Sequence, residues 1–548
     1  MNRIFFILLV SMIPCLAQAK TLDLSSLEDL AIQENGRSKP VIVFAVESLK
    51  TLYGKAHWKN EESKDSLSAM QVVTDLAFHP QNWIEQKLIR VDHLKLKKEL
   101  GLPRTEKYFS YAQLAKIERL QQLLEEVLAE RRKKNPEKLS PMLEAARSVG
   151  AKMDVFERLA GGRVWALVPH PSDPLNGAWS TFPDAAQNYP VEKLTPGLAA
   201  FQQMAAAYDQ EDQPAFDQAA AALKVEMRKL SPGVYPTESL LRLEHFYVQA
   251  HPFRLAWIAY LITVIALAVT SIKGRAVGYK IAWIFALIGF SIQFAGFVAR
   301  TLISGRAPVT NMYETVIWLG FGVMFFALIF EAIYRCRYFL LGATPVAVLS
   351  LILADSLPAV LNSAIHPLVP VLRHNFWLTT HVLSITSSYA ALALALGVGH
   401  IVLGKVIMGK SVSPSLFQYL YRSIQIGVLL LGAGTILGGV WANYSWGRFW
   451  DWDPKETWAL IALLCYLAIL HGRLAGWWGG FGLAVGSILA FQAIIMAWYG
   501  VNFILGAGLH SYGFGAGGLE YVSGFAVLEV LFVAFAIWTY RKQRVQPA

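Results

Sequence analysis

One stretch of the chain combines aromatic and charged residues in a pattern that suits a large planar ligand. Residues 441–458 read Trp-Ala-Asn-Tyr-Ser-Trp-Gly-Arg-Phe-Trp-Asp-Trp-Asp-Pro-Lys-Glu-Thr-Trp. Indole rings are wide, flat and rigid, so the cluster suggests a platform for a porphyrin. An interfacial aromatic belt is the alternative, but the interleaved charges favour the platform. The side chains assigned to it are Trp446, Trp450, Trp452, Asp453 and Trp458.

Two histidines could bind the iron of such a porphyrin. Neutral imidazole is a common axial ligand of haem iron. His381 is expected at the external start of a membrane span, and His510 in the external loop Val501–Leu519. Each alone reads as an ordinary interface histidine. Together with the Trp-rich segment they favour one haem held from both faces.

The other membrane-half histidines are expected elsewhere. His471 lies at the predicted cytoplasmic end of a span and could hold a second, transmembrane haem. Its partner ligand would come from His400 or from another protein. His366 and His374 flank Pro367–Leu372, which reads as an amphipathic external helix, and are expected to line a rim.

Haem carries two propionates, which need cations or hydrogen-bond donors. Arg448, Lys455 and Arg373 are candidates by charge. Pairing with the acidic residues of the same segment explains Arg448 and Lys455 equally well. The polar stretch Gly305–Glu314 could shape the site or cap the helix that follows it. The order Asp453-Pro-Lys-Glu predicts a helix start within the Trp-rich segment.

Composition places the chain in a membrane. Of 548 residues, 55% are hydrophobic and 16% are charged, unlike an average soluble protein. Up to Pro252 there are 31 Lys+Arg and 31 Asp+Glu, and the remainder has 18 against 8, so the net charge of +10 belongs to the membrane part. An excess of Lys and Arg in a membrane protein usually reflects its topology. No cluster of basic residues resembles a nucleic-acid-binding site. Without a Cys-x-x-Cys pair the chain is neither a dithiol reductase of that type nor a c-type cytochrome.

The first half divides into a targeting segment and a soluble region. Residues 1–19 read as a secretory signal peptide, with Arg3, an apolar run and Ala17-Gln-Ala19. Residues 20–250 are soluble in character and are predicted to be a mostly helical external domain. The predicted elements are a strand at Pro40–Ala45, helices near Gln113–Arg132, Pro196–Arg228 and Thr237–Gln249, and a long loop at Val168–Pro190.

Residues 253–548 contain nine apolar runs long enough to span a bilayer, which predicts an all-α polytopic membrane protein. The runs are Arg254–Ile272, Ile281–Ala299, Thr315–Tyr334, Phe339–Leu357, Phe376–Leu403, Ile424–Val440, Thr457–Leu470, Trp477–Tyr499 and Val522–Tyr540. Lys and Arg recur at alternate ends, which the positive-inside rule makes cytoplasmic. The Trp-rich segment and the soluble domain are therefore expected on the opposite, external side.

Several motifs together resemble a known family. Residues 446–458 resemble the "WWD" signature of the haem-handling proteins of cytochrome c maturation. Further segments resemble the CcsA branch of these proteins: Gly305–Glu314, His381-Val382, Ser388-Tyr-Ala390, Leu470-His-Gly-Arg473, Val501-Asn-Phe503 and Leu509-His-Ser-Tyr-Gly513. That resemblance covers Phe253–Ala548. Residues 20–250 are similar to the external domain of CcsB (ResB) in fused CcsB–CcsA proteins, best at Gly36-Arg-Ser-Lys-Pro40.

The resemblance implies specific ligands. His381 and His510 would ligate haem b beneath the WWD segment, and His471 would contribute to a transmembrane haem site. Fused proteins carry CcsB spans ahead of this domain, including a histidine that completes the inner site. Because a signal peptide is predicted here instead, a separate CcsB protein is one expected source of that ligand, and a differently built inner site is the other.

The resemblance also implies an activity. A system II cytochrome c biogenesis protein of the bacterial cytoplasmic membrane would take haem to the external face and present it to the Cys-x-x-Cys-His motif of apocytochrome c. It would act as part of a holocytochrome c synthase with a CcsB-type partner, and indirectly with thiol-disulfide reductases. The alternatives are a non-catalytic haem exporter and a bis-histidine haem protein that transfers electrons.

Overall fold

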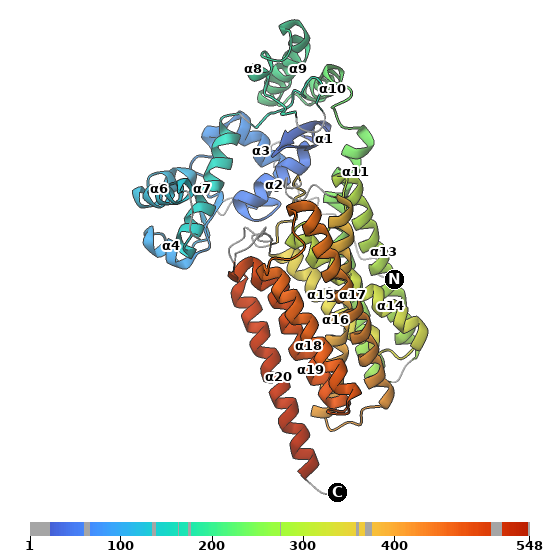
Figure 1. The fold of residues 1–548 in the computed structure, drawn as a ribbon. Helices are drawn as coiled ribbons and strands as arrows, with labels where there is room; N and C mark the ends of the chain where they lie inside the picture. Colours follow the sequence, from blue (N-terminus) through green and yellow to red (C-terminus); the bar gives the residue numbers. More distant parts are fainter. Residues whose placement is uncertain are drawn as a thin grey trace, which may run out of the picture.

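The chain folds into a bundle of long helices with a smaller, mostly helical region at one end (Figure 1). The computed structural model describes residues 22–59, 66–133, 139–162, 164–173, 177–273, 276–357, 361–367, 375–505 and 518–545. Within these ranges nine helices are long and apolar enough to span a membrane. The predicted multi-pass all-α fold with a mostly helical region ahead of it is therefore confirmed. The predicted signal peptide lies outside the described residues.

The described residues of the N-terminal region contain six short strands in three antiparallel pairs. They are β1 (Ala31–Glu34), β2 (Arg37–Pro40), β3 (His57–Lys59), β4 (Ser66–Ser68), β5 (Ile89–Arg90) and β6 (Tyr108–Phe109), paired β1–β2, β3–β4 and β5–β6. In the first pair Ala31 faces Pro40 and Glu34 faces Arg37. A pair of such short strands is not stable on its own, so the helices supply most of the core.

The helices of this region are α1 (Ser25–Glu28), α2 (Val41–Tyr53), α3 (Ala69–Phe78), η1 (Pro80–Asn82), α4 (Leu94–Glu99), α5 (Tyr111–Ala115), α6 (Glu118–Arg132), α7 (Pro141–Ala160), α8 (Phe182–Ala185), α9 (Val191–Asp209), α10 (Gln213–Leu230) and α11 (Glu238–Ala250). The strand predicted at Pro40–Ala45 is wrong, because Val41 begins α2. A short buried apolar run does not distinguish strand from helix. Here apolar spacing continues to Leu52, and Gly54 ends the helix at a φ of 85°.

Two of the predicted helices are each split in the structure. Gln113–Arg132 is interrupted at Ile117, whose extended backbone separates α5 from α6. Pro196–Arg228 is a helical hairpin, because Asp212 caps a new helix and accepts a hydrogen bond from the Ala215 amide. The helix predicted at Thr237–Gln249 is confirmed as α11.

The membrane-spanning part follows the predicted runs closely. Its helices are α12 (Pro252–Lys273), α13 (Ala276–Ser304), α14 (Met312–Tyr334), α15 (Tyr338–Ser356), α16 (Asn375–Ile407), α17 (Pro414–Trp446), α18 (Pro454–Leu474), α19 (Gly480–Ile495), the π-helix η3 (Met496–Leu505) and α20 (Leu519–Val545). The most buried span is α16, with 72% of its apolar window inside the protein, against 17% for α20. A central α16 gives any side chain on it a rigid setting.

A polar contact joins the N-terminal region to the bundle. At the turn between β1 and β2, Gly36 adopts a φ of 76° and lies beside Pro367. The next residue, Arg37, donates two hydrogen bonds to the Glu244 carboxylate on α11, at 2.8 and 2.7 Å, and one to the carbonyl oxygen of Ile365 at 2.9 Å. The Gly36–Pro40 motif thus contacts the segment of residues 361–367. The division of the chain at residues 250–253 stays a prediction.

Candidate haem site

The site is built around His381, which lies near the start of α16. Its Nδ1 is 2.8 Å from the carbonyl oxygen of Gly434 on α17. A carbonyl only accepts hydrogen bonds, so Nδ1 carries the proton and Nε2 carries the lone pair. A hydrogen bond of this kind orients a metal-binding imidazole and raises its basicity. His381 therefore has the tautomer that an iron ligand needs.

Close packing of α16 on α17 allows this contact. A Cβ atom added to Gly434 would lie 2.9 Å from the backbone of Ile385, and one added to Gly438 would lie 2.7 Å from Cε1 of His381. Our sequence analysis missed both glycines. Their Gly-x-x-x-Gly spacing in an apolar helix is a known signal for close helix approach, and it marks the wall against which His381 rests.

We expect Gly438→Ala to weaken haem binding about tenfold, because the new methyl group pushes the imidazole ring off its position. A spectroscopic haem titration of the purified protein measures this. Gly432→Ala, on the same helix, is the matched control because its Cβ would meet only Leu463, at 3.9 Å. Equal affinities for both variants and the unchanged protein would contradict the role of Gly438.

Tryptophans of the Trp-rich segment pack edge to face, and one of them lies beside His381. Trp441 is buried, and its ring lies parallel to that of His381, with centroids 6.1 Å apart. Trp446 meets Trp441 at 67° and 4.6 Å, and Trp450 meets Trp452 at 89° and 5.8 Å. Among the contacts described, these indoles form two edge-to-face pairs, Trp441–Trp446 and Trp450–Trp452.

Glu456 organises the loop between α17 and α18. Its carboxylate accepts hydrogen bonds from Arg448 at 3.0 Å and from the backbone amides of Asp451 and Asp453 at 2.9 and 3.2 Å. Asp453 caps α18, which begins at Pro454, as the sequence predicted. Asp453 thus has a structural role in the loop. The other two predicted platform residues, Trp450 and Trp458, are half-buried within the loop and the first turn of α18.

The Trp-rich loop is joined to η3, the helix that leads towards His510. Lys455, in the first turn of α18, donates a hydrogen bond to Oδ1 of Asn502 at 3.2 Å. One turn earlier on η3, Trp498 donates to Thr315 of α14 at 3.0 Å. A π-helix within a span often marks a functional position. His510 itself, like Arg373 and His374, lies outside the described residues.

His471 and His400 differ in what their rings can do. His471 is exposed at the far end of α18, about 27 Å from Asp453 at 1.5 Å per residue, so it lies far from the Trp-rich loop. Its Nδ1 is 2.9 Å from the Leu467 carbonyl, which leaves Nε2 with the lone pair. Both nitrogens of His400 face acceptors, the Leu396 carbonyl and the Glu529 carboxylate, each at 2.9 Å. His400 therefore pairs with Glu529, and its ring offers iron no lone pair in this arrangement.

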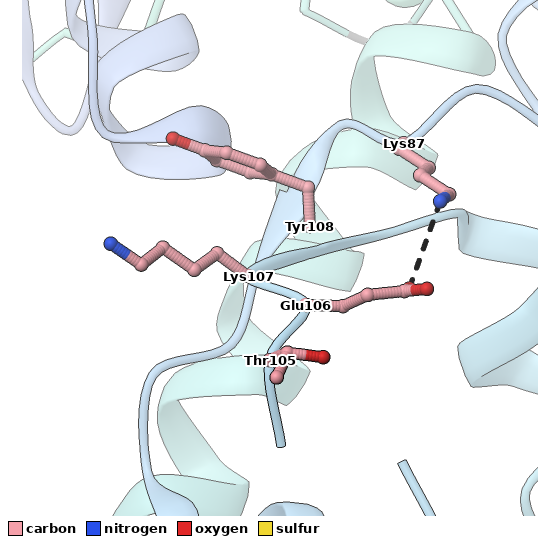
Figure 2. A pocket seen from close by; sticks show the side chains of 5 residues that line it. All are labelled: Lys87, Thr105, Glu106, Lys107 and Tyr108. Carbon is pink, nitrogen blue, oxygen red and sulfur yellow. Dashed lines mark ion pairs between the residues drawn. The ribbon is translucent and has the colours of Figure 1, made fainter. Parts of the chain in front are cut away.

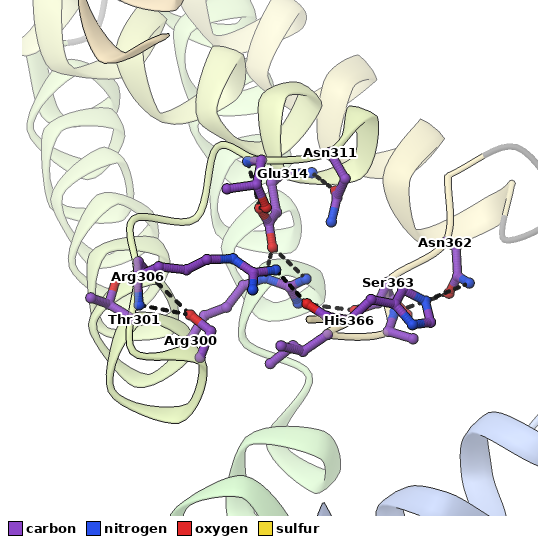
Figure 3. A network of polar contacts seen from close by, with 12 residues as sticks. Arg300, Thr301, Arg306, Asn311, Glu314, Asn362, Ser363 and His366 are labelled. Carbon is purple, nitrogen blue, oxygen red and sulfur yellow. Dashed lines mark hydrogen bonds and ion pairs between the residues drawn. The ribbon is translucent and has the colours of Figure 1, made fainter. Parts of the chain in front are cut away.

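A buried ion pair anchors the stretch Gly305–Glu314. Arg300 on α13 donates to the Glu314 carboxylate at 2.9 Å and to the Ser363 carbonyl at 2.9 Å. Figure 3 shows Arg306 beside it, reaching the carbonyl oxygen of His366. The Asn311 side chain caps α14, because its Oδ1 accepts a hydrogen bond from the backbone amide of Glu314. The capping role expected for this stretch is thus present, and Arg300 and Arg306 hold the segment that contains His366.

A hollow on the N-terminal region lies apart from these residues. Figure 2 shows it lined by Lys87, Thr105, Glu106, Lys107 and Tyr108. Lys87 and Glu106 form an exposed ion pair across it at 3.7 Å, while the side chains of Lys107 and Tyr108 point away from that pair. Its lining contains none of the predicted site residues, so we do not include it in the haem site.

Comparison with known proteins identifies relatives of both halves of the chain. The sequence profile of the cytochrome C assembly protein family matches residues 309–510. The protein NrfI of Wolinella succinogenes is 28% identical over 502 residues, covering 87% of this chain, which therefore spans about half (53%) of that relative's length. The cytochrome c biogenesis protein CcsA of Prochlorococcus marinus (strain NATL1A) is 38% identical over 295 residues, covering 46% of this chain and 92% of that relative.

Among solved structures, the cytochrome c haem lyase CcmF is similar to this chain, with a TM-score of 0.39 and 14% sequence identity. The alignment covers 54% of this chain and 51% of the CcmF chain. The family assignment rests on the sequence matches instead. Residues 253–548 make up little more than half of the chain, whereas the match to NrfI covers 87% of it. The similarity to NrfI therefore extends into the N-terminal region. Through its membrane-spanning half, this multi-pass membrane protein belongs to the CcsA family of cytochrome c biogenesis proteins.

Proposed function

We propose that this protein carries haem b to the external face of the bacterial cytoplasmic membrane and presents it for covalent attachment to apocytochrome c. The single observation that carries the proposal is the Nδ1 contact of His381 with the Gly434 carbonyl, because it gives Nε2 the lone pair that iron requires. Membership of a cytochrome c biogenesis family supports haem as the cargo.

The proposed roles of the side chains follow from their positions. His381 and His510 hold the iron at the external site. The Trp-rich segment, with Trp446, Trp450, Trp452 and Trp458, supplies apolar faces for the porphyrin, and Asp453 fixes the helix start beneath it. His471 serves a separate site at the other membrane face, with its second ligand supplied by a CcsB-type protein.

The attachment step conserves all atoms and needs no oxidant. Each cysteine of the Cys-x-x-Cys-His motif adds its S–H across one haem vinyl group, so that sulfur bonds to one vinyl carbon and hydrogen to the other. The thiols must be reduced beforehand, which makes thiol-disulfide reductases indirect partners. The protein contributes orientation, which converts an encounter into a reaction within one complex.

The external placement of the Trp-rich segment is supported by charge. Lys405 lies near the end of α16 opposite to His381, and Arg473 near the end of α18 opposite to Asp453. Positive residues gather on the cytoplasmic side of membrane proteins. This orientation puts His471 at the cytoplasmic face, where haem enters.

The test is maturation of a reporter cytochrome c in a bacterial strain that lacks its own maturation system. We expect the chain, together with a CcsB-type protein, to give a reporter band that keeps its haem in a denaturing gel. A reporter with both motif cysteines replaced by alanine is the control. Haem that accumulates on the external side without a thioether product would support an exporter instead. A redox-active haem without any product would support an electron-transfer protein.

A further inference from the structure

The stretch Lys87–Lys107 of the N-terminal region carries a local excess of positive charge. It contains seven Lys or Arg residues against three Asp or Glu residues, whereas the chain up to Pro252 is balanced. All three acids are already compensated, in the ion pairs Lys87–Glu106, Arg90–Asp92 and Arg119–Glu99. Four exposed cations form no ion pair with another described residue, and we call them the basic patch: Lys95, Lys98, Arg104 and Lys107. The patch is therefore available to an anion from outside the chain.

The members of the basic patch lie on neighbouring stretches of backbone. Lys95 and Lys98 belong to α4, and the buried Lys97 of the same helix donates a hydrogen bond to the carbonyl oxygen of Glu106. The backbone next to Lys107 is therefore held beside α4. Because the Debye length is about 8 Å at physiological salt, charges this close attract an anionic surface together.

The exposed face of α4 combines this charge with an apolar side chain. Leu96 and Leu100 are buried in the core of the N-terminal region, whereas Leu94, Lys95 and Lys98 lie on the opposite, exposed face. Leu94 is 53% exposed. An apolar side chain beside lysines is typical of helices that lie in the interface of a membrane, because a lysine can cover apolar surface with its stem and keep its ammonium group among the headgroups.

The position of α4 in the fold fits such an interface. In Figure 1 the lobe formed by α4, α6 and α7 extends sideways beyond the bundle, on the side of α20, and α4 lies level with the N-terminal end of α20. That end of α20 carries Leu519 and Tyr521, which are 47% and 63% exposed. Exposed tyrosines at the end of a span mark the boundary between membrane and water. The exposed face of α4 is therefore at the height of the lipid headgroups that surround α20.

We propose that α4 rests on the membrane surface beside α20 and that the basic patch binds the phosphate groups of anionic lipids. Leu94 enters the boundary between the headgroups and the acyl chains. This contact gives the N-terminal region a support on the lipid in addition to its contacts with the bundle. It requires only that the bundle spans a membrane, so it does not depend on haem or on the proposed function.

The test measures how fast single lysines of the full chain react with an uncharged amine-acetylating reagent in lipid nanodiscs. One set of nanodiscs contains phosphatidylcholine, which has no net charge, and the other contains equal parts of phosphatidylcholine and anionic phosphatidylglycerol. Mass spectrometry gives a rate for each lysine. We expect Lys95 and Lys98 to react about fivefold more slowly in the anionic nanodiscs, because each cation near an anionic surface strengthens binding by about that factor. At about 1 M salt the difference is expected to disappear.

Lys193 is the control within the same sample. It is exposed on α9, at the end of the N-terminal region farthest from the bundle, and is expected to react equally fast in both nanodiscs. In a Lys95→Gln variant the protection of Lys98 is expected to fall, whereas Lys193→Gln is expected to leave it unchanged. The inference is overturned if Lys95 and Lys98 react equally fast in both nanodiscs, or if Lys193 is slowed as much as they are.

Discussion

Replacing His381 by alanine is expected to remove haem from the external site and to lower mature cytochrome c at least a hundredfold. Loss of residues that merely orient an iron ligand already costs about 10- to 100-fold, and here the ligand itself is lost. The visible spectrum of purified protein carrying His471→Ala measures the effect, because a six-coordinate haem becomes five-coordinate or is lost. Added imidazole is expected to restore the original spectrum by occupying the vacated coordination position.

His366→Ala is the matched control for this experiment. His366 lies in the segment of residues 361–367, but the contact that it gives Arg306 comes from its backbone carbonyl and survives the substitution. We expect its haem content to be unchanged. A His381→Ala protein with the spectrum of the unchanged protein would remove His381 from the site, and equal losses in both variants would indicate a general defect of the external face.

Breaking the buried ion pair between Arg300 and Glu314 is expected to destabilise the protein by about 3–5 kcal/mol, because either substitution leaves one charge buried alone. Both side chains are fully buried, and Arg300 also supports the Ser363 carbonyl. Arg300→Met should lower both the yield of folded protein and its thermal midpoint, followed by size-exclusion chromatography after heating. The double variant Arg300→Met/Glu314→Gln should recover most of the loss.

The pair Arg254–Asp355 provides a control of the same chemistry at the surface. Its contact is equally short, at 2.8 Å, but the two side chains are 46% and 28% exposed. Exposed pairs contribute about 0–1 kcal/mol, so Arg254→Met is expected to shift the thermal midpoint little. A similar loss for Arg254→Met and Arg300→Met would show that burial is not the cause.

The proposed haem site is supported by contacts from several distant parts of the chain. His381 depends on α17, the Trp-rich loop depends on Glu456, and η3 is tied to both α14 and α18. The segment of residues 361–367 is held by Arg37 from the N-terminal region. Arg37 is thus a direct contact between the N-terminal region and the end of the bundle that carries His381.

Local sequence predicted the features whose causes are local. Length and hydropathy alone indicate a membrane span, and all nine predicted spans are present among the described helices. The start of α18 at Pro454 was predictable because Asp453, Pro454 and Glu456 satisfy the first turn by themselves. The chemical types that suit haem were likewise visible in the histidines and the Trp-rich segment.

Tertiary structure decided the features that depend on residues far apart in sequence. The run Val41–Ala45 is buried on all sides, so its apolar pattern does not distinguish a strand from the helix that the structure contains. His400 is paired with Glu529 only because α16 and α20 meet, and His381 has its tautomer only because Gly434 brings α17 close. The sequence by itself determined which residues could bind haem; tertiary structure decided which of them are already occupied, because a charge or lone pair is satisfied by neighbours in space.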